Sequence, residues 1–223
     1  MSLIEAKDVH FSYPAKKDAL NGVNFKIEDG EFVCVFGENG SGKSTLMKCI
    51  LGLYKPQSGE IIVNDRIGYL PQKTEIQSNF PASIEEVVLS GTIVNNIKKI
   101  WYSKRDIATA NKVMKELDLY DIKNKCFRDL SGGQQQRVLI ARAICATEKV
   151  IILDEPTNGL DPAISTQIYE ILERLNKKRK LTVIMVSHDI SRAIKYCNRV
   201  MEIKDGKVTY IGDAKNYKGG GVA

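Results

Sequence analysis

The segment Gly37-Glu38-Asn39-Gly40-Ser41-Gly42-Lys43-Ser44 has the residue types and spacing of a phosphate-binding loop. It follows an apolar run at residues 32–36 and opens, at Thr45, into a helix-like run that ends near residue 52. A glycine-rich turn between a buried strand and a helix N-terminus directs backbone N–H groups and the positive end of the helix dipole at one point. Lys43 can then reach the β- and γ-phosphates of a nucleotide, and the Ser44 hydroxyl can bind Mg²⁺. We therefore expect this segment to bind a nucleotide.

Two carboxylates, Asp154 and Glu155, follow a continuous apolar run at residues 150–153. Such a run is typical of a strand buried on both faces of a parallel sheet. Open α/β sheets bind ligands at the carboxyl ends of their strands, and carboxylates there are costly unless they meet a cation or a proton. We expect Asp154 to join the Mg²⁺ shell beside Ser44, and Glu155 to act on a water that attacks the γ-phosphate.

A second candidate anion site precedes the predicted helix at residues 135–146. There, Leu130-Ser131-Gly132-Gly133-Gln134 places Ser131 and Gln134 at the spacing of a capping box. The two glycines between them carry no side chains that could hide the backbone N–H groups. This pattern predicts a second bare helix N-terminus, suited to an anion.

Three further residues could contribute to the same site. Asp161 and Pro162 predict a helix start, with Asp161 as the cap. His188 follows a second apolar run, at residues 181–186, and a histidine at that sheet edge could bond a γ-phosphate, although a lone histidine is more often structural. Tyr13, just before Pro14, fits either strand packing or stacking on adenine.

The elements that position these residues begin with strands. Residues 3–11 and the alternating run 23–27 precede the turn Glu28-Asp29-Gly30, which leads into residues 31–36. Alternation and the Asp-Gly turn predict antiparallel pairing, hence a small antiparallel sheet before the loop. Further strands are expected at 60–63 and 66–70, where Pro71 ends the strand and leaves Gln72 on a loop. A terminal hairpin is expected at 200–203 and 208–211 about Asp205-Gly206.

Between Gln72 and Asp129 the pattern is helical. Ser83 is expected to cap a helix through residue 89, and residues 104–119 carry a one-sided apolar face. That face consists of Ile107, Ala110, Val113, Met114 and Leu117. The apolar residue in Asn79-Phe80-Pro81 is either a docking point or a hydrophobic staple. We expect this region to be a helical insertion in an α/β chain.

Composition is that of an ordinary globular protein, with 43% hydrophobic and 27% charged residues in 223. No apolar run reaches the ~20 residues of a membrane span, and no secretory signal is visible. Five scattered cysteines, without a CxxC pair, indicate reduced core thiols rather than disulfides or a metal site. The net charge of +6 is spread along the chain, and its densest cluster, at 177–180, is typical of a solvated helix end, so we expect no nucleic-acid partner.

Taken in order, the phosphate loop, Gln72, the 130–134 segment, Asp154-Glu155, Leu160-Asp161 and His188 resemble the ATP-binding cassette family. The resemblance implies an α/β fold with a P-loop NTPase core, an antiparallel β subdomain and an inserted helical subdomain. On this basis residues 1–217 form one domain, with the helical subdomain at about 73–130, and residues 218–223 form a flexible tail.

The same resemblance implies ATP and Mg²⁺ as ligands and a head-to-tail homodimer. Each ATP would lie between residues 37–45 of one subunit and Ser131-Gly132-Gly133-Gln134 with Asp161 of the other. Tyr13 would stack on adenine, His188 would contact the γ-phosphate, and Gln72 would link Mg²⁺ or the attacking water to a transmembrane partner. One departure is Gly159, where many family members have alanine; the aspartate that follows is kept.

The family also includes DNA-repair ATPases and translation factors, but this chain has neither a long coiled-coil insertion nor a tandem cassette. A transporter subunit remains, expected to be cytoplasmic and peripheral on the inner face of the membrane, with separate permease subunits docking on the helical subdomain. Residues 66–72 and 80–88 are similar to those of ATPases of zinc and manganese importers, which also use an extracytoplasmic binding protein. The alternative is a cassette for another cargo, such as a small organic solute or an exported compound.

Overall fold

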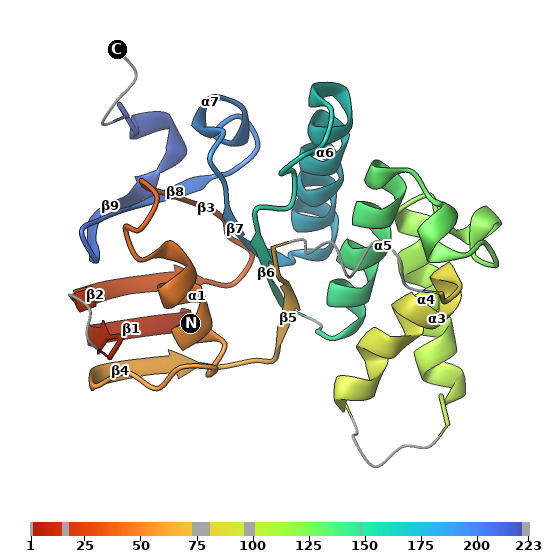
Figure 1. Cartoon of the computed structure of the whole chain (residues 1–223), viewed down its shortest axis with the longest axis horizontal. Helices are drawn as coiled ribbons and strands as arrows, with labels where there is room; N and C mark the ends of the chain where they lie inside the picture. The colour runs from red at the N-terminus through yellow and green to blue at the C-terminus, as the bar shows by residue number, and fades with distance from the viewer. Residues whose placement is uncertain (1, 15–17, 73–80, 96–100, 148, 220–223) are drawn as a thin grey trace. The chain divides into compact units, whose positions relative to one another are not determined.

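The structure is a computed structural model that describes residues 2–14, 18–72, 81–95, 101–147 and 149–219 (Figure 1). The chain divides into two compact units. The first unit combines Met1–Asp65 with Glu173–Ala223, and the second unit is Arg66–Leu172. The second unit is therefore an insertion in the sequence of the first. The helical region predicted at about 73–130 falls within it, although residues 73–80, with the Asn79-Phe80 position, lie outside the described residues.

An antiparallel sheet in the first unit is built from β1 (Ser2–Ser12), β2 (Asp18–Glu28) and β4 (Ser58–Val63). Its strand order is β2-β1-β4, and Figure 1 shows the three strands side by side. In the register, Ala6 pairs with Phe25 of β2 and with Ile61 of β4. The small antiparallel sheet predicted from the alternating pattern is thus confirmed.

The Asp29-Gly30 turn does not close a hairpin, contrary to the sequence prediction. The strand that follows it, β3 (Phe32–Phe36), pairs in parallel with β7 (Thr182–Val186) and β8 (Arg199–Lys204). All five side chains of β3 are buried, as expected of a strand covered on both faces, so it cannot share the half-exposed sheet of β2. The turn therefore carries the chain from one sheet to another.

The end of the chain forms the predicted hairpin, with β9 (Lys207–Asp213) antiparallel to β8. The first unit is completed by α1 (Lys43–Ile50), the short α7 (Ile190–Ala193) and the 3-10 turn η4 (Ala214–Asn216).

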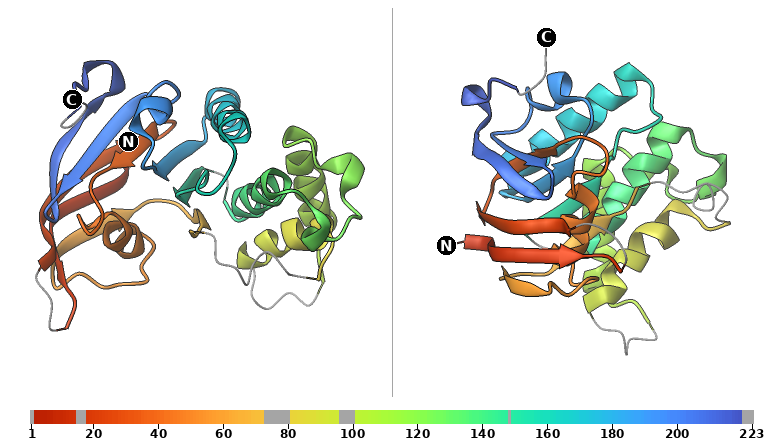
Figure 2. Two further views of the ribbon diagram at one scale, coloured as in Figure 1. Left: turned by 45° about the horizontal axis from the view of Figure 1, so that its top comes forward. Right: turned by 60° about the vertical axis from the view of Figure 1, so that its left-hand side comes forward.

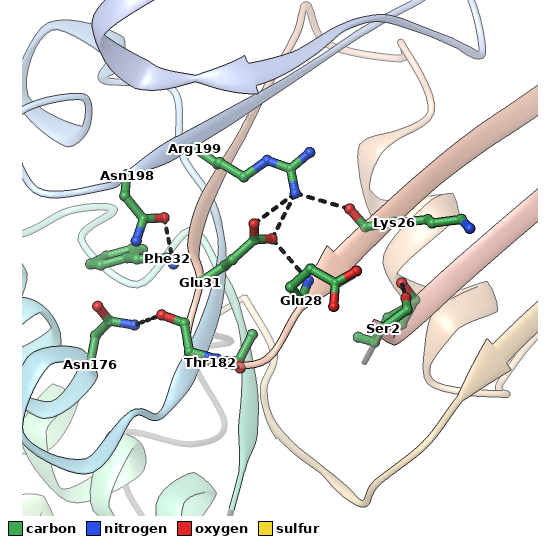
Figure 3. A network of polar contacts seen from close by, with 11 residues as sticks. Ser2, Lys26, Glu28, Glu31, Phe32, Asn176, Thr182, Asn198 and Arg199 are labelled. Atoms are coloured by element: carbon green, nitrogen blue, oxygen red, sulfur yellow. Dashed lines mark hydrogen bonds and ion pairs between the residues drawn. The ribbon is translucent and has the colours of Figure 1, made fainter.

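Polar contacts hold the beginning of β3 in place (Figure 3). Nη1 of Arg199 lies 2.7 Å from Oε2 of Glu31 and 3.1 Å from the carbonyl oxygen of Lys26. The N–H of Phe32 donates to Oδ1 of Asn198 at 2.9 Å, and the N–H of Asn198 donates to the Phe32 carbonyl at 3.0 Å. Because the ion pair is partly buried, solvent screens it less than a surface pair. These bonds tie β3 to β2 and β8, and the far end of β3 carries the phosphate loop.

The second unit combines a parallel strand pair with helices. Its strands are β5 (Ile67–Leu70) and β6 (Val150–Asp154), and β6 is buried throughout. Its helical elements are α3 (Ile84–Ser90), η1 (Gly91–Asn95), α4 (Lys104–Glu116), η2 (Tyr120–Ile122), η3 (Phe127–Asp129), α5 (Gly132–Cys145) and the start of α6 (Pro162–Arg179). Helices α3, α4 and α5 pack against one another (Figure 2). In the described part of the chain, no helix is long and apolar enough to cross a membrane.

Helix starts in this unit follow local sequence signals. Ser83 caps α3 as predicted, and Ser103 caps α4, each within a capping box. Helix α4 ends at Glu116 rather than at residue 119, because Asp118 adopts a left-handed backbone with φ of 57°. The predicted apolar face of α4 is buried except for Ile107, which is 41% exposed. Ile107 lies in the first turn of α4, and the apolar spacing predicts which face it shares but not whether that face is covered there.

The cysteines behave as the sequence predicts for core thiols. Cys34, Cys49, Cys145 and Cys197 are buried, Cys126 is half-buried, and none of the five is in a disulfide. Burial raises the pKa of the Cys49 thiol to about 11, so that thiol stays protonated and unreactive at neutral pH.

Candidate functional site

The phosphate loop connects β3 to α1, the setting predicted from sequence. Lys43 begins α1, and its Nζ donates to the carbonyl oxygens of Gly37 and Glu38, at 2.8 Å each. Only 6% of Lys43 is exposed, and a buried ammonium needs such partners to be stable. The loop carbonyls therefore hold the charged end of Lys43 at the loop.

Two loop glycines are required by both conformation and space. Gly37 and Gly42 have φ of 150° and 108°. A Cβ on Gly37 would lie 2.2 Å from the carbonyl oxygen of Ile203, and one on Gly42 would lie 2.5 Å from that of Ala19. The loop is therefore pressed against the main chain of β8 and β2, and larger residues would displace it.

The turn of the β8–β9 hairpin supports the loop from outside. The N–H of Gly206 donates to the Ser41 carbonyl at 2.9 Å, and the N–H of Asn21 donates to the Gly206 carbonyl at 2.8 Å. Gly206 thus links Ser41 of the loop to Asn21 of β2. Sequence reasoning identified Gly206 only as a turn residue, because this contact joins positions far apart in the chain.

We expect Gly206→Ala to weaken nucleotide binding. Gly206 has φ of 73°, and an added Cβ would lie 2.9 Å from the Ala19 carbonyl oxygen. The turn must then shift and weaken its bond to Ser41, which is worth about 0.5–1.5 kcal/mol, or roughly two- to ten-fold in ATP affinity. Isothermal titration with a non-hydrolysable ATP analogue measures the effect.

Gly52→Ala is the matched control. Gly52 has φ of 70°, but an added Cβ there would meet no atom within 4 Å. This variant has the same backbone strain, about 1–2 kcal/mol, without touching the loop. Its ATP affinity should equal that of the parent, and equal losses in the two variants would show that Gly206 acts through stability alone.

The start of α1 fits an anion. Gly42 occupies the N-cap position, and no side chain caps the helix. Oγ of Ser41 is buried and has no hydrogen-bond partner among the described residues. Uncapped helix N–H groups, the helix dipole and the Lys43 ammonium together suit the phosphates of a nucleotide. Thr45 is buried, whereas Glu38, Asn39, Gly40 and Ser44 are exposed where a ligand could reach them.

Tyr13 lies beside this loop. Its hydroxyl is 3.1 Å from Oγ1 of Thr45, and its ring packs edge-on against Phe11 and Tyr54. The side chain is half-buried. These contacts place Tyr13 next to the first turn of α1, and its stacking on adenine stays a prediction.

His188 lies at the same sheet edge as the loop. Val35 of β3 pairs with Val186 of β7, and the N–H of Ser187 donates to the Val35 carbonyl at 3.2 Å. His188 is the next residue and is exposed. The first unit therefore brings together Tyr13, the phosphate loop and His188, whereas the γ-phosphate contact of His188 stays a prediction.

The second unit carries the candidate carboxylates at the end of β6. Asp154 is the last residue of the strand and is buried. The burial of Tyr69, on the neighbouring strand β5, raises the pKa of its hydroxyl, and the charge of Asp154 raises it further. Glu155 is half-buried and has a left-handed backbone, with φ of 52°. A non-glycine residue in that conformation is strained, and such strain gathers at functional sites.

Two amides hold the Glu155 carboxylate. Oε2 of Glu155 accepts from Nε2 of Gln72 and from Nδ2 of Asn158, both at 2.9 Å. Gln72 was predicted to act near the attacking water, and in this structure it contacts the proposed base directly. Asn158 was missed from sequence; its position three residues after Glu155, on a turn, was the available signal.

Helix α5 begins at Gly132, three residues before the predicted start at residue 135, and the predicted capping box is present at this start. The N–H of Gln134 donates to Oγ of Ser131, and the N–H of Ser131 donates to Oε1 of Gln134. The capping box thus engages the Gln134 amide, so this helix start is less bare than predicted. A Cβ on Gly133 would lie 2.6 Å from Cγ2 of Ile164, so a small residue is required where α5 packs on α6. Ser131 and Gly132 are exposed.

Asp161 caps α6 as predicted, with its Oδ1 accepting from the N–H of Ala163 at 2.8 Å. Asp161 is exposed, and Gly159 before it has φ of 71°. An alanine at Gly159 would find space but would be strained, so glycine suits the turn as this chain builds it.

Residues 20–158 match the ABC transporter family. The probable metal transport system ATP-binding protein of Thermotoga maritima is 35% identical over 201 residues, which cover 90% of this chain and 81% of that protein. The zinc uptake system ATP-binding protein ZurA of Listeria innocua is 35% identical over 227 residues, covering 97% of this chain and 88% of that protein.

Solved structures show the same similarity. A metal-chelate type ABC transporter in an inward-facing conformation gives a TM-score of 0.87 at 30% identity, covering 96% of this chain and 84% of that chain. A dimeric ATP-binding cassette in a post-hydrolysis state, bound to ADP and Pi, gives a TM-score of 0.79 at 31% identity, covering 96% of this chain and 100% of that chain.

Proposed function

The chain belongs to the ABC transporter family, and on this premise we propose that it is the ATP-hydrolysing subunit of an importer for a divalent metal ion such as zinc or manganese. One observation carries the choice of cargo: relatives named as metal and zinc transport ATP-binding proteins match 90% and 97% of this chain. The chain would work on the cytoplasmic face of the membrane, bound to separate permease subunits.

In the proposed mechanism, the first unit binds the nucleotide. The Lys43 ammonium and the backbone N–H groups at the start of α1 hold the β- and γ-phosphates. His188, at the adjacent strand end, contacts the γ-phosphate. Tyr13 stacks on adenine. The loop geometry supports this assignment because its glycines and buried lysine leave the helix N-terminus open to an anion.

The second unit supplies the base. Glu155 accepts a proton from water as the water oxygen attacks the γ-phosphorus, and the bond from that phosphorus to the β–γ bridging oxygen breaks. ADP leaves and inorganic phosphate forms. Gln72 and Asn158 orient the Glu155 carboxylate through their hydrogen bonds.

In the proposed site, Mg²⁺ would be held by the Ser44 hydroxyl, the Asp154 carboxylate and the oxygen of the Gln72 amide. These are hard oxygen ligands of the kind that Mg²⁺ takes. When bound, the ion neutralises charge on the phosphate oxygens.

We propose that two copies of the chain pair head to tail. Ser131-Gly132-Gly133-Gln134 and Asp161 of one copy would then face the ATP held by the other. The dimeric state of a cassette similar over 96% of this chain supports the pairing. In a full importer, an extracytoplasmic binding protein would deliver the metal to the permease.

The paired site predicts slow, concentration-dependent hydrolysis by the isolated chain. Half of each site comes from a second copy, so the rate per subunit should rise with protein concentration. Phosphate release measured over a dilution series checks this. A high rate per subunit that does not depend on concentration would contradict the paired site.

The cargo is tested by deleting the gene and growing the cells with a metal chelator. We expect a growth defect that added zinc or manganese relieves, and that a Glu155→Gln copy of the gene fails to complement. Normal growth under chelation would assign the subunit to another cargo and leave its ATPase activity untouched.

A further inference from the structure

The segment 101–107, at the start of α4, has an unusual apolar surface. Among the described residues, the exposed large hydrophobic side chains are Leu53, Ile93, Trp101, Tyr102 and Ile107. Three of them lie within the 101–107 segment, and Trp101 is 84% exposed. Single exposed apolar residues need no explanation, but a cluster with a nearly fully exposed tryptophan indicates a surface that is covered in use.

This segment is also basic. Lys104 and Arg105 are exposed, whereas Asp106 is buried, and its carboxylate accepts from the N–H and hydroxyl of Ser103 at 2.7 and 2.6 Å. Asp106, the only acidic residue of the segment, therefore forms part of the capping box of α4. The sequence between Leu89 and Asp106 contains four basic residues, Lys98, Lys99, Lys104 and Arg105, and no acidic residue.

Aromatic and basic residues together suit a lipid headgroup region. Tryptophan and tyrosine each combine an apolar ring with a polar N–H or O–H, and both concentrate at membrane–water interfaces. Basic side chains are attracted to anionic lipids by about 1 kcal/mol each, which is roughly five-fold in binding. An apolar groove on a protein partner would cover Trp101 but would give no reason for the surrounding positive charge.

We propose that the 101–107 segment contacts the anionic surface of the membrane beside the permease. This inference rests on the proposed function, which brings the chain to that surface. The contact would be weak, because one short segment with two described basic residues cannot anchor a protein alone. It would orient a subunit that the permease already holds.

Trp101 makes the proposal directly measurable because it is the only tryptophan of the chain. Vesicles of phosphatidylcholine and phosphatidylglycerol should shift its fluorescence to the blue and reduce quenching by iodide. Vesicles of phosphatidylcholine alone should have little effect, and high salt should reverse the shift. Unchanged fluorescence with the mixed vesicles would overturn the proposal. A shift seen only when the vesicles contain the permease would instead assign the segment to that protein.

Matched variants test whether vesicle binding depends on this segment or on positive charge anywhere on the chain. Lys104→Gln with Arg105→Gln should weaken co-sedimentation with the mixed vesicles roughly 25-fold, at about five-fold per charge. Lys177→Gln with Lys178→Gln removes two exposed charges from the end of α6 and should change little. Trp101→Ala should weaken binding, whereas Leu53→Ala, at an exposed leucine outside the 101–107 segment, should not. Equal losses in the two charge pairs would refute the segment as the site.

ATP hydrolysis without vesicles should be unchanged in all these variants. Unchanged fluorescence with the mixed vesicles would therefore refute the membrane contact and leave the proposed ATPase function intact. Absence of ATP hydrolysis would refute the proposed function, whereas the vesicle measurement would still test the membrane contact.

Discussion

Glu155→Gln should nearly abolish ATP hydrolysis while ATP binding is retained. General base catalysis contributes about 10²–10⁴-fold, so kcat should fall by about that factor. The substitution removes the charge that accepts the proton from water but keeps the size of the side chain. An amide oxygen can still accept from Gln72 and Asn158, so the loop that carries the residue should keep its geometry.

Loss of hydrolysis without loss of binding should trap the ATP-bound dimer. We expect Glu155→Gln with MgATP to elute from a sizing column at twice the monomer mass, and removal of nucleotide or Mg²⁺ to reverse this. Glu170→Gln is the control, because Glu170 is an exposed glutamate on α6 and its loss should leave both kcat and elution unchanged. Hydrolysis by Glu155→Gln at close to the parent rate would show that Glu155 is not the base, and the next candidates would be His188 as the base and Gln72 as the residue that positions the water.

The local parts of the site could be predicted from sequence because each is a contiguous pattern. The phosphate loop, the capping box of Ser131 and Gln134, and the Asp161 cap are all formed within a few residues, where backbone chemistry decides the conformation. Buried strands such as β6 could be predicted equally well, since a continuous apolar run is typical of a strand that is covered on both faces.

The parts that sequence did not predict depend on contacts between distant positions. The transfer of β3 out of the antiparallel sheet is set by its pairing with β7 and β8, more than 140 residues away. The support of Ser41 by Gly206 is of the same kind. Ile107 fits the apolar period of α4 but is exposed. Its exposure could not be predicted, because periodicity shows which face a residue shares and not what covers that face.

Lys43→Ala should weaken ATP binding itself, at least about 10²-fold, since a charge-assisted hydrogen bond is worth about 1.5–3 kcal/mol and Lys43 can offer more than one to the phosphates. The structure adds a second effect. The Lys43 ammonium also bridges the carbonyls of Gly37 and Glu38, so the variant loses a brace of the loop. Titration with a non-hydrolysable analogue measures affinity, and thermal unfolding without nucleotide measures the structural loss.

Lys48→Ala separates the phosphate contact from a general loss of charge on α1. Lys48 lies on the same helix with its Nζ 5.3 Å from the centre of the Tyr54 ring, so its removal should cost about 0.5–1 kcal/mol of stability and leave ATP affinity unchanged.

A ligand stabilises the fold only if it binds the native state. Added ATP should therefore raise the Tm of the parent, of Lys48→Ala and of Glu155→Gln, but not that of Lys43→Ala. Lys43→Ala should also form no ATP-dependent dimer, because it fails before chemistry begins. An affinity within a few-fold of the parent would show that the helix N-terminus binds the phosphates without the lysine.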